Sequence, residues 1–140
     1  MVYKKYGDTV VLRLEVGDEI TSSVQKVAED LGVLSASVSG IGATDDFTVG
    51  VFDMGKRDYE RFSYKGNHEI NTLIGNITQK DGKPYVHLHL TATGKEGKVV
   101  GGHLLSGVIS LTAEIFIHVF DARLVRERDE KLGINLIGVK

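Results

Sequence analysis

Three histidines lie on two neighbouring segments that both have the composition of β-strands. His87 and His89 belong to the run Tyr85–Leu90, and His103 belongs to the run Lys98–Leu105. Successive side chains of a strand point to opposite faces, so His87 and His89 share one face. Neutral imidazole is a good ligand for Zn²⁺ and similar ions, and three such ligands leave a fourth position open. The pattern therefore predicts a three-histidine site for a divalent metal, with zinc as the preferred ion.

The place of His103 in this site depends on the register of the hairpin that joins the two segments. Gly94–Gly97 separates them and has the length of a hairpin loop. With such a loop, Gly102 lies opposite His89 and the side chain of His103 points to the other face. A one-residue bulge at Gly101–Gly102 moves His103 opposite His89. The metal site therefore requires a bulge that these two glycines would accommodate.

Other interpretations of the histidines remain open. Without a metal, they would form hydrogen bonds in a polar groove or a subunit interface. A catalytic site would use metal-bound water as a nucleophile and would need a general base nearby; Glu114, Asn76 and Ser106 are candidates for lining it. A cupin-like enzyme is a weaker hypothesis, because Gly94 stands near the position where that pattern has a glutamate. We therefore rank a structural or ligand-binding role above catalysis and leave catalytic residues unassigned.

The composition is that of one globular domain spanning residues 1–140. The chain is 41% hydrophobic and 26% charged, and its 17 glycines and single proline favour strands and turns over a helical bundle. It has no cysteine, which excludes disulfides and thiolate metal sites. We find neither a signal peptide nor a run of about 20 apolar residues. We therefore expect a cytoplasmic protein without membrane association.

Hydrophobic periodicity predicts one helix among many strands. Apolar residues recur at helical spacing from Ile20 to Leu31, with Asp18 as the expected N-cap and Gly32 as the stop. Turn signals lie at 55–58 and 80–83. The expected strands span residues 9–15, 33–39, 46–53, 59–64, 69–78, 85–90, 98–105 and 110–120.

The last twenty residues differ from this core, which spans about residues 9–120. Charges of both signs alternate over 123–131, and an apolar run follows at 134–137. A mixed charge run is usually a solvated face, so we expect this one to face water. The apolar end of segment 121–140 is expected to pack on the core or on a neighbouring subunit.

Three blocks of the chain resemble a known family. Ser37–Ala43, Lys83–Leu90 and Val99–Gly107 are similar, in order and spacing, to the PPC domain, named for its occurrence in plants and prokaryotes. The resemblance implies an α/β fold of the α+β type, with a mainly antiparallel sheet, one principal helix packed on it, and a homotrimeric assembly. It also implies a small stand-alone prokaryotic protein, of a kind that in some members carries a metal on these histidines.

The family label also suggests a DNA-binding or transcription-associated protein. Plant members carry an AT-hook, but the only proline here, Pro84, lies inside the domain and no such hook is present. The net charge is −2, and the predicted helix carries four acidic residues against Lys26, so no aligned basic face exists to read DNA. We therefore favour metal binding through His87, His89 and His103, with a small-molecule ligand as a further partner.

Two other features have modest interpretations. Gly40–Gly42 hints at a dinucleotide-binding loop, but Asp45 occupies the place of the third glycine and no helical period follows. A tight turn or a close approach between strands explains these glycines better. His68 and His118 match no family histidine, and we expect them to be structural or exposed.

Overall fold

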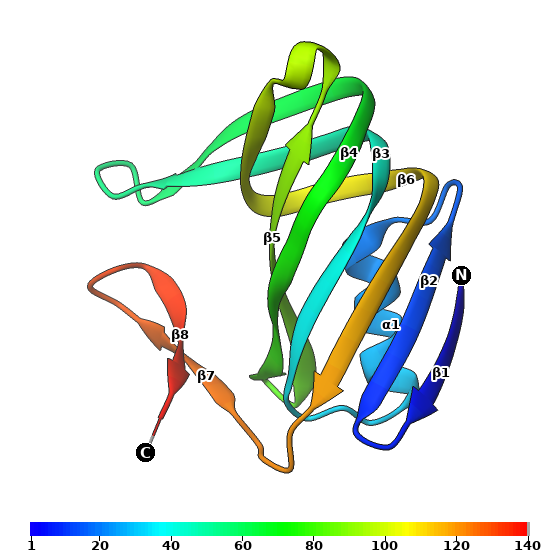
Figure 1. Cartoon of the computed structure of the whole chain (residues 1–140). Helices are drawn as coiled ribbons and strands as arrows, with labels where there is room; N and C mark the ends of the chain where they lie inside the picture. Colours follow the sequence, from blue (N-terminus) through cyan, green and yellow to red (C-terminus); the bar gives the residue numbers. More distant parts are fainter. Residues whose placement is uncertain (140) are drawn as a thin grey trace.

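The computed structural model describes residues 1–139, which form a single sheet and one α-helix (Figure 1). The strands are β1 (Val2–Tyr6), β2 (Thr9–Glu15), β3 (Ala36–Asp53), β4 (Asp58–Lys80), β5 (Lys83–Thr93), β6 (Val99–Val119), β7 (Val125–Asp129) and β8 (Ile134–Gly138). The helix is α1 (Ile20–Asp30), and a short 3₁₀ turn spans Lys95–Gly97. The predicted fold, a mainly antiparallel sheet with one principal helix, is confirmed. No helix in the described part of the chain is long and apolar enough to cross a membrane.

Three strands are much longer than the sequence predicted. β3, β4 and β6 each run through a region that was expected to hold two separate strands, and they curve strongly (Figure 1). In β3, Gly40 and Gly42 lie within one continuous strand, where they mark an irregularity. The register of β3 shifts between Gly40 and Gly42 and again between Thr44 and Asp46. A Cβ on Gly42 would lie 2.6 Å from Ala113 Cβ, so these glycines allow a close approach between strands, as predicted.

The strand pairings place β5 at the centre of the site. The sheet order is β1-β2-β6-β3-β4-β7-β8, and β5 pairs with both β4 and β6. Because β6 also pairs with β3, and β3 with β4, these four strands form a closed circuit of pairings. The parallel contact between β4 and β7 is limited to the pair Gln79–Val125. The β7–β8 hairpin and the tip of the β3–β4 hairpin project on the same side (Figure 1).

The core lies between the sheet and α1, which packs against β5 and β6. α1 contributes Ile20, Val24, Val27 and Ala28, all fully buried. Strands β2 to β6 add mainly alternate residues to this core, as expected for a sheet with one covered face. The fully buried large side chains are Phe47, Leu12, Leu14, Ile20, Leu73, Ile77, Leu88, Leu90, Ile109, Ile115, Ile117 and Val10.

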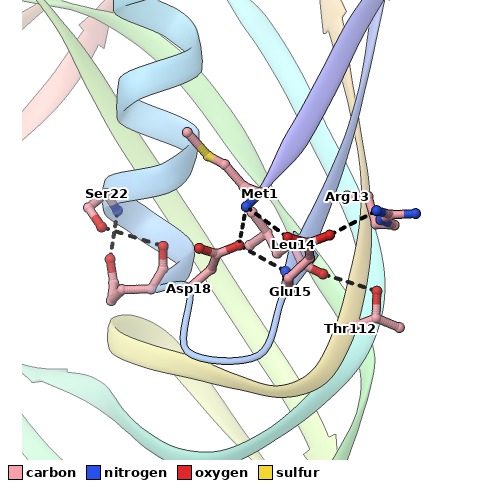
Figure 2. A network of polar contacts seen from close by, with 8 residues as sticks. Met1, Arg13, Leu14, Glu15, Asp18, Ser22 and Thr112 are labelled. Atoms are coloured by element: carbon pink, nitrogen blue, oxygen red, sulfur yellow. Dashed lines mark hydrogen bonds and ion pairs between the residues drawn. The ribbon is translucent and has the colours of Figure 1, made fainter.

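The two ends of α1 test the capping predictions. Glu19, not Asp18, is the N-cap: its carboxylate accepts a hydrogen bond from Ser22 N at 2.6 Å. Asp18 instead accepts a bond from Glu15 N at 2.8 Å and pairs with the N-terminal ammonium of Met1 at 2.9 Å (Figure 2). Asp18 is therefore used to close the turn and to hold β1, a strand that the sequence did not predict.

The C-terminal end of α1 is as predicted. Gly32 adopts a left-handed conformation with φ +62°, which favours glycine. The N–H groups of Gly32 and Val33 donate to the carbonyls of Glu29 and Ala28, the two bonds of a Schellman motif.

Gly75 allows the backbones of β4 and β5 to come close at the histidines. It pairs with Leu88, between the pairs Ile74–His89 and Asn76–His87. A Cβ on Gly75 would lie 1.9 Å from the carbonyl oxygen of His87, a contact that backbone atoms cannot relieve without moving. The position of both histidines therefore depends on the absence of a side chain here.

Gly75→Ala is expected to lower the free energy of unfolding by about 1–3 kcal/mol, because the added methyl group separates β4 from β5. Urea denaturation measures this effect. Gly55→Ala is the matched control, since its Cβ would meet only the end of the Asp53 side chain, at 3.2 Å. Equal stability of the two variants would contradict the steric account of Gly75.

Candidate metal centre

The hairpin between β5 and β6 brings His103 directly opposite His89. The last pair before the loop is Thr93–Val99, so the loop includes Lys98 and has one residue more than predicted. The 3₁₀ turn Lys95–Gly97 takes up this residue, and Gly94 N donates to Lys98 O at 3.0 Å. The register runs without interruption through Gly101 and Gly102. The predicted bulge is therefore wrong, although His103 does lie opposite His89 as the metal site requires.

His87, His89 and His103 converge on the outer face of the sheet. One ring nitrogen from each lies within 4.8 Å of the others, and the two Nε2 atoms of His87 and His89 are 3.2 Å apart. The intervening Leu88 points into the core and is 2% exposed. Two adjacent strands therefore hold the three imidazoles, as the sequence pattern predicted.

Aromatic packing fixes the third ring. Tyr59 stacks on His103 with ring centroids 4.6 Å apart and an interplanar angle of 21°. Gly50 provides room for this stack, because a Cβ on Gly50 would lie 2.7 Å from the Tyr59 ring. Tyr59, near the start of β4, and Gly50 of β3 thus position the His103 ring that β6 carries. Nδ1 of His103 is buried and has no hydrogen-bond partner among the described residues.

The spacing of His87 and His89 fits a tetrahedral metal ion. Two nitrogens that each lie about 2.0–2.1 Å from Zn²⁺ are separated by roughly 3.3 Å, close to the 3.2 Å between His87 and His89. Burial, followed by the charges of His103, Arg126 and His89, lowers the pKa of His87 to about 4. Burial and His89 also lower the pKa of His103. These two rings are therefore neutral at neutral pH, which is the form that coordinates metals.

A buried arginine borders the cluster. Arg126, on β7, is 8% exposed and donates to Thr78 Oγ1 at 2.9 Å, Asn76 Oδ1 at 2.9 Å and the carbonyl of Asn135 at 2.8 Å. Its Nη2 also lies 3.3 Å from Nδ1 of His87. The expectation that the charge run of residues 123–131 faces water is therefore wrong at Arg126. The alternation of β7 directs this side chain inward, toward polar groups of β4 and β5.

A cavity of about 260 Å³ opens beside the histidines. It lies between the β3–β4 turn, the β7–β8 hairpin and the strands that carry His87 and His103. Its lining residues are Phe52, Arg57, Asp58, Tyr59, Tyr85, His87, His103, Arg126, Arg128, Gly133, Ile134 and Asn135. Segment 121–139 thus forms one wall of the site, while Lys140 lies outside the described residues.

Only one of the three predicted lining residues lies at the cluster. Asn76 pairs with His87 across β4 and β5 and holds Arg126. Glu114 lines a separate cavity together with Ile41 and Leu111, without any of the three histidines. Ser106 is exposed and pairs with Thr48 on β3. Distances between strands could not be predicted from the residues alone, and the register of β6 carries Glu114 and Ser106 away from the site.

The other two histidines have separate contacts. Nδ1 of His68 lies 2.6 Å from the carbonyl of Gly66, and its ring packs edge-on to Phe47. His118 is exposed and lies 3.3 Å from the hydroxyl of Thr9. Both are therefore structural or exposed, as predicted.

Comparison with known proteins identifies the family. The model of the Plants and Prokaryotes Conserved (PCC) domain matches residues 1–121. The chain belongs to the PCC domain family. The resemblance seen in the sequence is therefore confirmed, and the match covers every strand that carries a histidine of the cluster. No functionally curated protein matches the chain.

Solved structures resemble this PCC domain over nearly its whole length. A plant- and prokaryote-conserved protein from Pyrococcus horikoshii has a TM-score of 0.89 at 31% identity, covering 99% of this chain and 96% of the other. A metal-containing protein from Archaeoglobus fulgidus has a TM-score of 0.88 at 31% identity, covering 99% of both chains. A Bacteroides thetaiotaomicron protein, provisionally named as DNA-binding, has a TM-score of 0.94 at 28% identity, covering 98% and 96%.

His87 is expected to titrate near pH 4 in the metal-free protein. Its folded-state pKa of about 4 lies below the unfolded value of 6.5. Between these two pH values, the unfolded chain therefore binds more protons than the folded chain. The free energy of unfolding should therefore decrease as the pH falls from 6.5 toward 4. NMR titration of the ring and urea denaturation at pH 7 and pH 5 measure the two effects. His87→Gln should weaken this pH dependence and His118→Gln should not; a His87 pKa near 6.5 would contradict the prediction.

Proposed function

We propose that this PCC domain binds a divalent metal ion, zinc in first place, through His87, His89 and His103. The observation that carries the proposal is the convergence of three imidazoles from paired strands, with two ring nitrogens 3.2 Å apart. The buried and unpartnered Nδ1 of His103 adds support, since a ring nitrogen in this state lacks the partner that buried polar atoms normally have. The neighbour from Archaeoglobus fulgidus is itself named as metal-containing.

The proposal is one of binding and not of hydrolysis. A hydrolytic metal site needs a general base within reach of the bound water. Among the described residues that line the cavity, the only carboxylate is Asp58. That group accepts a hydrogen bond from Tyr59 N at 2.7 Å and pairs with Arg61 at 3.8 Å. Glu114, the other carboxylate considered, lines a different cavity.

Protein purified without a histidine tag is expected to contain one zinc ion per chain, and His87→Ala/His89→Ala is expected to contain none. Elemental analysis measures the metal. Zinc at about 100 times its dissociation constant should raise the free energy of unfolding by about 2.7 kcal/mol in the wild type only. His118→Ala is the matched control, because this histidine lies outside the cluster. A metal-free wild type that zinc does not stabilise would refute the site.

The homotrimer implied by the family resemblance belongs to the same proposal. The outer face of the sheet carries exposed apolar side chains beside the cluster, namely Ile74 at 55% exposure and Phe116 at 48%. Ser39 pairs with both of them, and Ile74 also pairs with His89, so these residues form one row across the sheet. Exposed apolar patches on a sheet commonly mark contacts between chains. We infer that this face supports the trimer contact.

Sedimentation equilibrium is expected to give the mass of three chains for the wild type. Ile74→Lys/Phe116→Lys should give the mass of one chain, because two charges in the row would be desolvated by the contact. Val16→Lys is the control, since Val16 is an exposed apolar residue, 69% exposed, in the turn just after β2. If the wild type is a monomer, the trimer proposal is wrong. If the double variant is still a trimer, the contact between chains lies on another surface.

DNA association is the second hypothesis and has weaker support. It is favoured by the names of two structural neighbours, from Bacteroides thetaiotaomicron and Ralstonia eutropha, each provisionally called DNA-binding. The charge pattern opposes it. Lys26 of α1 is paired with Asp30, at 2.9 Å, and the chain has a net charge of −2. Phosphate contacts require free basic groups on one surface.

A further inference from the structure

Arg126 is a buried cation without an acidic partner among the residues that the structure describes. Its hydrogen bonds reach a hydroxyl, an amide and a backbone carbonyl, and its remaining contacts are the rings of His87 and Tyr85. In the described part of the chain, no carboxylate lies within ion-pairing distance of it. Burying an unpaired charge is costly, and such charges usually have a counter-ion. The fold keeps this charge at the wall of an open cavity.

The cavity as a whole carries an excess of positive charge. Within residues 1–139, Arg57 and Arg128 line it together with Arg126, against the single carboxylate of Asp58. Asp58 is already paired with Arg61, at 3.8 Å. Among the described residues, the only ion pair of Arg128 is a 3.7 Å contact with the exposed Glu130, which contributes little to its neutralisation. An anion entering the cavity therefore meets three guanidinium groups at its walls.

The remaining walls suit the body of a small organic molecule. Phe52, Tyr59 and Ile134 supply apolar surface beside the polar groups. Ligand cavities for larger molecules span roughly 300–1,000 Å³, whereas this one measures about 260 Å³. We propose that the cavity beside the histidine cluster binds a small organic anion, a carboxylate or a phosphate, with Arg126 as its buried counter-charge. Arg57 and Arg128 attract the anion from the rim.

The inference rests on the proposed metal site in one respect only. His87 and His103 form part of the cavity wall, so a bound cation would add positive charge there. Arg126 supplies its charge whether or not the histidines hold a metal. The anion site and the metal site are therefore tested separately, on metal-free and zinc-loaded protein.

Isothermal titration calorimetry with isobutyrate and with inorganic phosphate is the experiment. We expect saturable binding of at least one of them to the metal-free wild type, and no binding of the neutral isobutyramide. Arg126→Met should weaken binding at least tenfold, whereas the exposed Arg123→Met should leave it unchanged. The preferred probe identifies the anion class, carboxylate or phosphate.

Asn135→Asp keeps the proposal testable if Arg126→Met does not fold. Asn135 lines the cavity, its carbonyl accepts a bond from Arg126 at 2.8 Å, and its buried Oδ1 has no partner among the described residues. A carboxylate of the same shape would supply an internal counter-charge. It should therefore lower the affinity for the anion at least tenfold while raising the melting temperature. A merely structural Asn135 would not give both effects.

The outcomes separate the two proposals. Zinc binding without anion binding overturns the anion site alone, and anion binding without zinc binding overturns the metal site alone. Equal binding of isobutyramide would overturn the anion site, because it would show that charge is not recognised. An equal loss in Arg123→Met would overturn it too, since a general charge effect would then explain the result.

Discussion

The register of β5 between β4 and β6 is the constraint on which the rest of the structure depends. A strand alternates its side chains, so one register places Leu88 and Leu90 in the core and His87 and His89 outside it. A slip by one residue would bury two imidazoles and expose two leucines. The core and the candidate metal centre are therefore fixed by the same set of backbone hydrogen bonds. Gly75 makes that register possible, because it lets the two backbones approach at His87.

The C-terminal hairpin turns an open histidine cluster into a site with walls. The residue just before this hairpin, Leu124, is hydrogen-bonded to the core. Gln79 N donates to Leu124 O at 2.8 Å, and Leu124 N donates to Ser35 Oγ at 2.8 Å. Arg126 then lies across the paired strands β4 and β5, where its hydrogen bonds replace the packing that an apolar side chain would give. A charged residue in this position is a costly way to attach a hairpin. This cost has an explanation if the charge of Arg126 also binds an anion in the cavity.

The sequence was sufficient for features set by local chemistry. The periodicity of α1, the stop at Gly32 and the shared face of His87 and His89 all follow from side chains near one another in the chain. Features set by distant partners were not predictable. Asp18 has the right chemistry for an N-cap, but the ammonium of Met1 competes for it. Alternation within residues 123–131 could have placed Arg126 on an inward face, yet nothing local distinguishes it from its charged neighbours.

Arg126 links the histidine cluster to the cavity through a single ring. It donates to Nδ1 of His87, at 3.3 Å, only while that nitrogen is unprotonated, which puts the proton of the neutral ring on Nε2. A neutral His87 that used Nε2 as a metal ligand would carry its proton on Nδ1, facing the arginine. Two donors cannot share that contact, so Arg126 would keep its bond to Asn76 and lose its bond to the ring. The position of one proton on His87 thus decides whether Arg126 bonds to the ring, whereas its charge stays at the cavity wall in both states.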